Sequence, residues 1–344
     1  MIPAMMRAAV LRENGGPEVL KVESVPVPVI GSTQVLLKVA AAGVSYHDIV
    51  ERNGVYKRGV KLPEIPGIEA AGTVVAVGDA IGDDVHIGDR VAMIPWHGCG
   101  FCRLCRSGFE TSCRDRKGNK GGYAEYMAVY GDSVARIPEN VGMEEACMLG
   151  AATGVALNAV RDVASVRIGN RVLVTGSSGG IGIPSIQIAK ASGAWVLGHT
   201  RSNEKAQRLL DLGADDVIVS GAGEDFSEEV RRRTGGGVEV VIDTVGSSVF
   251  TSAFRSLDAH GRYAVVGQLV GEEVSINLAR IFFKRITLSG VGSVSREQLR
   301  DVVKLVETGQ IRPLVAQVFS LDKIAEAHAL VESGTAFGRV VVCP

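Results

Sequence analysis

The sequence has no excess of charge and no long apolar run, and each of these shortages excludes a class of protein. Its 37 basic and 38 acidic residues leave a net charge of -1, so a surface for nucleic acid or another polyanion is not expected. No apolar stretch is long enough to span a bilayer, and residues 1–13 lack the pattern of a secretory signal. We therefore expect a cytoplasmic protein that binds neither nucleic acid nor membranes.

The chain of 344 residues is long enough for two domains, and its pattern changes near Leu149. Before Leu149, short segments rich in Val, Ala and Ile alternate with Gly, Pro and Asp, which predicts a mostly-β domain. The expected strands are Arg7–Arg12, Val35–Ser45, Ala70–Gly78, Asp89–Pro95 and Ala124–Pro138.

After Leu149, apolar strands alternate with helices, which is typical of a parallel sheet with helices on both faces and right-handed crossovers. We expect strands at Arg171–Thr175, Trp195–His199, Asp216–Ser220, Val238–Val241 and Tyr263–Val266, and helices at Gly180–Ser192 and through Lys205 and Leu210. The sequence therefore predicts an α/β protein, with a doubly wound Rossmann-type domain at residues 151–290.

The C-terminal segment changes pattern again. A capping box of Ser295 and Gln298 precedes a helix with one apolar face, formed by Leu299, Val302, Val303 and Val306. A strand, a helix and a last strand follow at Leu314–Phe319, Asp322–Glu332 and Arg339–Val342. We interpret residues 1–150 and 291–344 as one catalytic domain into which the Rossmann-type domain is inserted.

A glycine-rich turn predicts a dinucleotide site. Arg171–Gly182 reads RVLVTGSSGGIG, a strand followed by a turn and the start of a helix. Glycines there free the backbone, leave room for a pyrophosphate and let the helix pack close to the strand. The N–H groups and dipole at the helix start then favour phosphate. The predicted phosphate loop comprises Gly176, Ser177, Ser178, Gly179, Gly180, Ile181 and Gly182, and a tight turn without a ligand is the alternative.

The end of the second Rossmann strand selects between NAD and NADP. NAD sites usually place an Asp or Glu there to bind the ribose hydroxyls. This chain has Thr200 at that position, followed by Arg201, Ser202 and, one helical turn on, Lys205. Arg and Lys attract a 2′-phosphate. We therefore predict NADP(H). In the alternative, Arg201 and Lys205 are ordinary solvated charges at the start of a helix.

Four of the six cysteines are crowded together, with the spacing C-x2-C-x2-C-x7-C. Four thiolates on a short loop can close a tetrahedral shell around zinc and leave no open position for catalysis. We predict one structural Zn²⁺ in a lobe at about residues 95–115. The ligands are Cys99, Cys102, Cys105 and Cys113, and His97 is expected to be a loop residue. An iron–sulfur cluster and a pair of disulfides are the alternatives.

These motifs, in this order, resemble the zinc-containing alcohol dehydrogenase, or medium-chain dehydrogenase/reductase, superfamily over essentially the whole chain. Further signposts are Gly43–Asp48, Pro66–Gly72, Gly88–Val91, Gly122–Tyr126 and Asp243–Gly246. The acryloyl-CoA reductase and quinone oxidoreductase branches look most similar. The resemblance implies a GroES-like catalytic domain, a Rossmann domain and a homodimer or homotetramer. It also implies nucleotide contacts from Thr153, Thr244, Val245, Val266, Gly267, Gln268, Gly290, Val291 and Arg339.

The sequence departs from the superfamily where catalytic zinc is normally bound. A Cys after the Gly-Val pair, a His before the Glu and a later Cys or Asp hold that zinc in the alcohol dehydrogenases. Here the three positions hold Ser45, Ile68 and, near the third, Leu149. Two hydrocarbon side chains and a neutral hydroxyl are poor zinc ligands. Cys147 would be a lone thiol ligand if the alignment shifts by two residues, so we predict no catalytic zinc.

Without a Lewis acid, polarising an isolated carbonyl is hard, whereas hydride can add to a conjugated C=C–C=O whose enolate is stabilised by hydrogen bonds. We therefore predict an NADPH-dependent reductase of a small-molecule enone, quinone or enoyl thioester. The segment where the first zinc ligand would lie holds Ser45, Tyr46 and His47 instead. Tyr46 or His47 is the candidate proton donor. Asp48 and Glu69 complete the candidate catalytic set, although a structural pairing with Arg339 is favoured for them. Tyr56 and Trp96 are candidate pocket walls.

Three other functions remain open on the sequence. They are a zinc alcohol dehydrogenase with unusual ligands, a biosynthetic reductase of an imine or another intermediate, and a protein that binds NADPH without catalysis. Oligomer formation is expected through the apolar run Ile281–Phe283 and a strand at Ile286–Val291, paired edge to edge across a two-fold axis.

Overall fold

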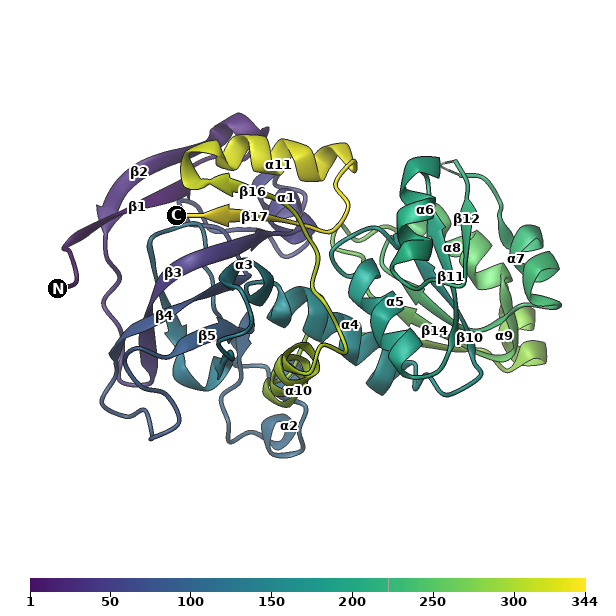
Figure 1. The fold of residues 1–344 in the computed structure, drawn as a ribbon, viewed down its shortest axis with the longest axis horizontal. Coiled ribbons are helices and arrows are strands. Elements are labelled where there is room, and N and C mark those ends of the chain that lie inside the picture. The colour runs from purple at the N-terminus through teal and green to yellow at the C-terminus, as the bar shows by residue number, and fades with distance from the viewer. Residues whose placement is uncertain (222) are drawn as a thin grey trace. The chain divides into compact units, whose positions relative to one another are not determined.

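The computed structural model describes residues 1–221 and 223–344, which divide into two compact units. The first unit comprises Met1–Gly154, Ser293–Gly309 and Pro313–Pro344, and the second comprises Val155–Gly292 and Gln310–Arg312. Figure 1 shows the C-terminal segment, in yellow, contributing to the same unit as the purple N-terminal strands. The chain is therefore an α/β protein in which one unit is inserted into the other.

The first unit is built mainly from antiparallel strands. Its strands are β1 (Met5–Leu11), β2 (Leu20–Pro26), β3 (Gln34–Val44), β4 (Ala70–Val77), β5 (Arg90–Met93), β6 (Trp96–His97), β7 (Lys117–Gly118), β8 (Tyr126–Tyr130), β9 (Val134–Arg136), β16 (Val315–Ser320) and β17 (Arg339–Cys343). Its larger sheet has the order β16-β17-β3-β4-β5-β9, with β8 also paired to β3. The long β3 is almost wholly buried, because alternate residues serve cores on both of its faces.

The helices of the first unit lie between or beside its strands in the sequence. They are η1 (Pro17–Val19), α1 (Tyr46–Arg52), α2 (Arg103–Arg106), η2 (Glu110–Ser112), η3 (Gly131–Ser133), α3 (Met143–Ala146), η4 (Leu149–Gly154), α10 (Arg296–Glu307), η6 (Leu321–Lys323) and α11 (Ile324–Ser333). The Ser295–Gln298 capping box at α10 is confirmed, and Leu299, Val302, Val303 and Val306 are buried as predicted. The single strand expected over Ala124–Pro138 is wrong. The chain turns through η3, which separates β8 from β9, and the two strands pair with different neighbours.

The second unit contains a six-stranded sheet of β10 (Arg171–Thr175), β11 (Trp195–Thr200), β12 (Asp216–Val219), β13 (Val238–Asp243), β14 (Leu257–Val265) and β15 (Thr287–Gly290). All five pairings are parallel and the order is β12-β11-β10-β13-β14-β15. The helices are α4 (Val155–Leu157), η5 (Asn158–Val163), α5 (Gly182–Ala191), α6 (Asn203–Asp211), α7 (Ser227–Thr234), α8 (Ser247–Arg255) and α9 (Leu278–Lys284). Numbered from its first strand, the sheet has the 3-2-1-4-5-6 order of a dinucleotide-binding fold.

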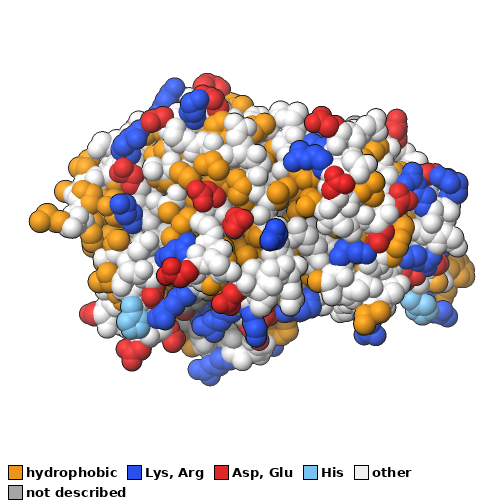
Figure 2. All heavy atoms as spheres, viewed as in Figure 1, with side chains coloured by type: hydrophobic (Ala, Val, Ile, Leu, Met, Phe, Trp, Pro, Cys, Tyr) orange, Lys and Arg blue, Asp and Glu red, His pale blue; other side chains and the backbone are white. Residues whose placement is uncertain are grey.

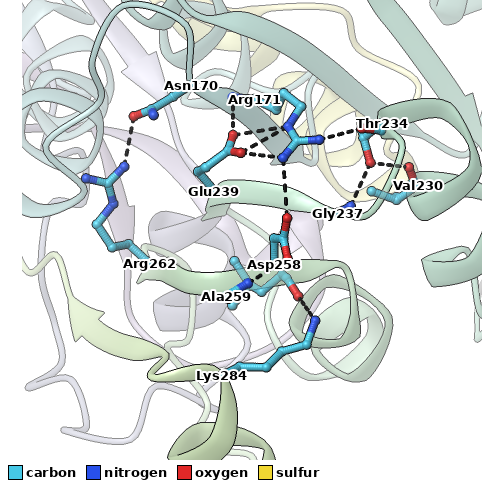
Figure 3. A network of polar contacts seen from close by, with 11 residues as sticks. Asn170, Arg171, Val230, Thr234, Gly237, Glu239, Asp258, Ala259, Arg262 and Lys284 are labelled. Carbon is cyan, nitrogen blue, oxygen red and sulfur yellow. Dashed lines mark hydrogen bonds and ion pairs between the residues drawn. The ribbon is translucent and has the colours of Figure 1, made fainter.

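A polar network joins three strands of this sheet near their amino ends (Figure 3). The Arg171 backbone N–H and guanidinium both donate to Glu239, and the guanidinium also reaches Asp258 at 3.4 Å. Arg262 donates to the Asn170 amide oxygen at 2.8 Å. These contacts tie β10, β13 and β14 together at the end opposite the glycine-rich turn, so they hold the sheet in register without occupying the predicted nucleotide site.

Two surface properties bear on the sequence predictions. On the face drawn in Figure 2, basic and acidic side chains lie among one another rather than in one large patch of a single sign. Within residues 1–221 and 223–344, no helix combines the length and the apolar character needed to cross a bilayer.

Candidate active site

The corner that carries Ser45 is built by the end of β3 and the start of α1. Ser45 is the N-cap of α1, and it forms a capping box with Asp48. Its hydroxyl donates to Asp48 Oδ2 at 2.6 Å, and its backbone N–H donates to the same oxygen at 2.8 Å. Asp48 is fully buried. Both side chains are therefore committed to starting the helix, which is the structural role that Ser and Asp commonly have at this position.

Glu69 and Arg339 form a buried ion pair beside this corner. Arg339 Nη2 donates to Glu69 Oε1 at 2.9 Å, as expected from the sequence. Burial raises the pKa of Glu69 to about 7, although Arg339 acts in the opposite direction. A Cβ atom at Gly43 would lie 2.1 Å from Glu69 Oε2, so a side chain there would displace the Glu69 carboxylate. The pair joins β17 to β4 through β3, and any contact of Arg339 with the nucleotide stays a prediction.

The other two positions of the expected metal corner carry hydrocarbon side chains. The Gly43 N–H donates to the Glu69 carbonyl at 3.2 Å. The segments that carry Ser45, just after β3, and Ile68, just before β4, therefore lie close together. Leu149 begins η4 and is fully buried. Cys147 is also buried, its thiol donates to the Glu144 carbonyl at 3.2 Å, and burial raises its pKa. A neutral, hydrogen-bonded thiol is a weak metal ligand.

His47 and Tyr46, the candidate proton donors, occupy different environments. Tyr46 is 63% exposed, so its hydroxyl is not held within the first unit. His47 is half-buried, with its ring edge-on to Tyr56 at 4.8 Å between centroids. Burial lowers the pKa of His47, and Asp48 raises it. His47 is therefore the better-positioned acid–base group of the two.

Three charged residues next to His47 were missed from the sequence. Glu51 Oε2 lies 3.6 Å from His47 Nδ1, and Lys120 Nζ lies 2.7 Å from the same carboxylate oxygen. Lys120 Nζ also donates to Glu64 Oε1 at 2.6 Å. The i, i+4 spacing of His47 and Glu51 on a helix was a usable signal. Nothing local points to Lys120 or Glu64, because the fold brings them in from distant segments.

The donor atoms of His47, Asp48 and Glu51 lie within 4.8 Å of one another, which is close enough to share a metal ion. However, Asp48 already accepts both hydrogen bonds from Ser45, and the Lys120 ammonium already contacts Glu51. A divalent cation there would meet this ammonium at close range and would have to displace it. The built-in cation makes these three residues a poor metal site.

The four clustered cysteines converge as the spacing predicts. Their sulfur atoms all lie within 4.8 Å of one another, with Cys102 Sγ 3.5 Å from Cys105 Sγ and 3.9 Å from Cys113 Sγ. Backbone N–H groups of Cys102 and Cys105 point at sulfur atoms, which favours thiolates. Four sulfurs at this spacing fit a tetrahedral Zn²⁺.

His97 contacts Tyr130 and Asp132 rather than the four sulfur atoms. It belongs to β6 rather than to a loop, its ring stacks on Tyr130 at 4.0 Å, and its Nδ1 lies 2.7 Å from Asp132 Oδ1. Arg296 at the start of α10 also pairs with Asp132, at 2.8 Å. These contacts anchor the cysteine lobe to α10.

In the second unit, the glycine-rich turn leads from β10 to α5 as predicted. Gly176 has φ of +60°, and a Cβ atom at Gly182 would lie 2.2 Å from the Gly176 carbonyl oxygen. The buried Ser177 hydroxyl donates to the Val174 carbonyl at 2.6 Å and accepts from the His199 N–H at 2.8 Å. Ser177 therefore braces the turn against β11. The remaining turn residues Ser178, Gly179, Gly180 and Ile181 lead to a helix start whose N–H groups suit a phosphate.

The end of β11 carries a concentration of positive charge. Thr200 closes the strand, and Ser202 caps α6 by accepting the Lys205 N–H at 3.3 Å. Burial and then Arg201 lower the pKa of Lys205, so the two cations lie near each other. Burial and Arg201 also lower the pKa of His199 to about 4, which keeps this histidine neutral. The end of β11 therefore carries two neighbouring cations and a neutral histidine.

A buried carboxylate organises the remaining predicted nucleotide residues. Asp243 accepts hydrogen bonds from the Thr175 hydroxyl at 2.6 Å, the Tyr263 hydroxyl at 2.7 Å and the Val245 N–H at 3.0 Å. It thereby positions Thr244 and Val245 next to the turn. At neighbouring strand ends, a Cβ atom at Gly267 would lie 2.6 Å from the Thr244 carbonyl oxygen. The structure thus brings together the predicted residues Thr244, Val245, Val266, Gly267, Gln268, Gly290 and Val291 at the carboxyl ends of β13, β14 and β15.

Thr153 is the one predicted nucleotide residue besides Arg339 that belongs to the first unit. It lies in η4 and is buried, and its hydroxyl has no hydrogen-bond partner within residues 1–221 and 223–344.

Comparisons with known proteins agree with this arrangement. Residues 31–139 match the family described as alcohol dehydrogenase GroES-like domain, and residues 180–308 match the family described as zinc-binding dehydrogenase. An acryloyl-coenzyme A reductase of Sulfurisphaera tokodaii is 35% identical over 94% of this chain and 96% of its own. The crystal structure of AibC superimposes with a TM-score of 0.92 at 38% identity, covering 99% of this chain and 96% of that one. A crystal structure of an NAD-dependent alcohol dehydrogenase gives a TM-score of 0.92 at 34% identity, covering 98% and 100% of the two chains.

Proposed function

The chain belongs to the medium-chain dehydrogenase/reductase superfamily and is an oxidoreductase, and we propose that it uses NADPH to reduce a C=C bond conjugated to a carbonyl, without catalytic zinc. The observation that carries this proposal is the corner of Ser45, Ile68 and Leu149. Its only polar side chain, Ser45, donates its hydroxyl hydrogen bond to Asp48. The acryloyl-coenzyme A reductase among its relatives supports an enoyl thioester as the substrate class.

The choice of NADPH rests on the end of β11. The glycine turn leaves room for a pyrophosphate, because Gly176 and Gly182 approach each other where any side chain would collide. Arg201 and Lys205 supply two cations beside Thr200, and this position holds no carboxylate to repel a 2′-phosphate. When bound, the cofactor supplies a hydride. One zinc ion in the cysteine lobe would have a structural role only.

The chain's own residues must then stabilise and protonate the reduced substrate. A conjugated carbonyl needs hydrogen-bond donors at its oxygen as the enolate forms, and a proton at the carbon next to the carbonyl. Tyr46 and His47, at the first turn of α1, are the polar side chains of the corner that are not used for capping. We assign the proton to His47 and leave hydrogen bonding to the enolate oxygen to Tyr46. Ser45, Asp48 and Glu69 maintain the corner.

A second candidate is a zinc alcohol dehydrogenase with atypical ligands, favoured by the grouping of His47, Asp48 and Glu51 within 4.8 Å. The NAD-dependent alcohol dehydrogenase of the same fold makes this a natural rival. It requires Lys120 to leave Glu51. It therefore predicts a second zinc ion per chain and oxidation of simple alcohols.

We also propose that two copies pair through β15. This strand is the edge of the six-stranded sheet, so one side of its backbone is unpaired within the described part of the chain. The neighbouring α9 exposes Leu278, Phe282 and Phe283, each by more than three quarters of its reference surface. A two-fold axis beside β15 would continue the sheet and cover this apolar helix at once.

The experiment is a substrate panel followed by NADPH absorbance. We expect acryloyl-CoA, or another enoyl thioester, to be reduced with NADPH, and simple alcohols to be inert with NADP⁺. Product analysis with deuterated NADPH should place deuterium at the carbon distal to the carbonyl. Oxidation of plain alcohols with no turnover of any activated alkene would refute the proposed function.

A further inference from the structure

We propose that Glu51, Lys120 and Glu64 are positioning residues that together hold one exchangeable proton beside His47, so that His47 can protonate the reduced substrate and be recharged. This inference rests on the proposed function for its final step. Its electrostatic part concerns the first unit alone and can be tested separately.

The four groups form a row of ion-pair contacts, of which the one at His47 is longer than a hydrogen bond. Glu64 Oε1 lies 2.6 Å from Lys120 Nζ, Lys120 Nζ lies 2.7 Å from Glu51 Oε2, and that oxygen lies 3.6 Å from His47 Nδ1. The row begins at partly exposed groups, since the side chains of Lys120 and Glu64 are 24% and 17% exposed. It ends at His47 in the first turn of α1. Water therefore has access to one end of the row, and the candidate proton donor lies at the other.

Glu51, Lys120 and Glu64 together carry a net negative charge when all three are ionised. Two carboxylates and one ammonium leave one negative charge in excess, which a single additional proton would neutralise. Burial raises the pKa values of Glu51 and Glu64 and lowers that of His47, so carboxyl and imidazole approach each other in proton affinity. Burial opposes the charged form of Lys120, but hydrogen bonds to Glu51 and Glu64 raise its pKa, so it stays an ammonium. These opposing shifts favour an extra proton that moves between His47 and a carboxyl group.

Other charged groups near His47 do not replace this row. Asp48, on the same helix, raises the pKa of His47. Its Oδ2 is held by Ser45 in the capping box, and its Oδ1 is buried with no hydrogen-bond partner in the described part of the chain. Tyr56 contacts the imidazole by its ring edge. The remaining titratable neighbours are Lys120, which lowers the pKa of His47, and Glu64, which raises it. Asp48 is fully buried, whereas Glu51 is connected through Lys120 to the partly exposed Glu64, so Glu51 is the carboxylate that can exchange a proton with His47 and be recharged from water.

The chemistry balances. Hydride adds to the C=C carbon distal to the carbonyl, and the π electrons of the C=C bond move toward the carbonyl to form an enolate. The N–H bond of protonated His47 then breaks as a C–H bond forms next to the carbonyl. His47 takes a proton from the Glu51 carboxyl group. Water then protonates Glu64, and the shift of one proton from Glu64 to Lys120 and of one from Lys120 to Glu51 restores the Glu51 carboxyl group. One hydride and one proton are consumed for each double bond reduced.

The test compares Glu51→Gln with Lys120→Met by the pH titration of the His47 ring, measured by NMR in the nucleotide-free protein, and by the pH dependence of kcat. Glu51→Gln removes a negative charge and should lower the pKa of His47, by about one unit. Lys120→Met removes a positive charge and should raise it by a similar amount. Turnover needs protonated His47, so the pH above which kcat falls should move down in the first variant and up in the second.

Two controls separate this effect from damage to the fold. Lys120→Arg keeps the charge and should restore the wild-type pH profile, and Glu64→Gln is a milder version of Glu51→Gln with the same direction of shift. NADPH binding, whose predicted contacts include none of these residues, should be unchanged in all four variants. Shifts in the same direction for Glu51→Gln and Lys120→Met, or no shift in either, would overturn the inference. If the titrations shift as expected but the wild type reduces no activated alkene, the electrostatic coupling of Glu51, Lys120 and Glu64 to His47 is supported and the proposed function fails.

Discussion

Single side chains decide what the corner at the start of α1 can do. A serine in place of a metal-binding cysteine could in principle act as an acid, but the Ser45 hydroxyl is used to cap the helix. A lysine then supplies the local positive charge, because Lys120 lies between Glu51 and Glu64. An ammonium cannot accept electron density from a carbonyl oxygen as zinc does, yet it can set the protonation of a neighbouring histidine.

The charges after β11 give the first prediction. Arg201→Ala combined with Lys205→Ala should raise KM for NADPH by about tenfold or more and leave KM for NADH nearly unchanged, because a hydrogen bond to a charged group contributes about 1.5–3 kcal/mol. Steady-state kinetics with both cofactors measures this. Arg208→Ala, further along α6, is the matched control and should have little effect. A wild-type enzyme that prefers NADH would contradict the assignment.

Two buried histidines predict loss of stability in acid. Burial lowers the pKa values of His199 and His328 from 6.5 to about 4. The unfolded chain therefore binds these protons first, and stability falls as pH drops from 6.5 towards 4, by roughly 3 kcal/mol for each histidine. His328→Asn should lower stability at pH 7 but flatten its pH dependence in this window. Denaturant unfolding at several pH values measures the slope, and an unchanged slope would contradict the prediction.

At the scale of elements, the turn between β10 and α5 depends on close approach of its backbone. Gly182→Ala places a Cβ atom 2.2 Å from the Gly176 carbonyl oxygen, so the helix start must move away from the strand. We expect NADPH affinity to fall by at least tenfold, measured by fluorescence titration. Gly82→Ala is the control, because a Cβ atom there meets nothing within 4 Å. Equal affinities for the two variants would show that the turn is not the phosphate site.

The cysteine lobe gives a prediction about metal content. Removal of zinc by a chelator, or Cys113→Ser, should make the segment near α2 and η2 sensitive to protease, because four thiolates lose the ion that joins them. NADPH binding should persist, since none of the predicted nucleotide residues lies in the cysteine lobe. Limited proteolysis with elemental analysis tests both points. Iron in place of zinc would show that the lobe holds a different centre.

Elements with strong local signals were predicted well, and the failures have physical causes. The glycine turn, the capping box at Ser295 and the convergence of four cysteines follow from short-range patterns. The break between β8 and β9 was missed because both halves are rich in β-forming residues, and only their different partners reveal the turn. Lys120 was missed for a related reason. Its contacts with Glu51 and Glu64 span 69 and 56 positions of sequence, and no local pattern encodes them.

At the scale of the whole molecule, the two units have different tasks in the proposed reaction. The second unit carries the nucleotide loop, whereas the first carries the acid–base row and the cysteine lobe. The superfamily relationship covers both units, and it is the side chains of the first unit that distinguish a metal-free reductase from an alcohol dehydrogenase.

Association of two copies is the prediction that belongs to this scale. Phe282→Ser with Phe283→Ser should shift the protein from dimer to monomer, because the apolar surface of α9 would no longer be covered. Light scattering across a dilution series measures the change. Val29→Ser, at an exposed apolar position in the first unit, is the control. A wild type that is monomeric at all concentrations would contradict the pairing through β15.

The most direct measurement is the zinc content of the active enzyme, determined by elemental analysis alongside turnover of an enoyl thioester. The account predicts one zinc ion per chain and steady reduction by NADPH in the presence of a chelator that strips weakly held metals. Two zinc ions per chain, with turnover lost when one of them is removed, would contradict it.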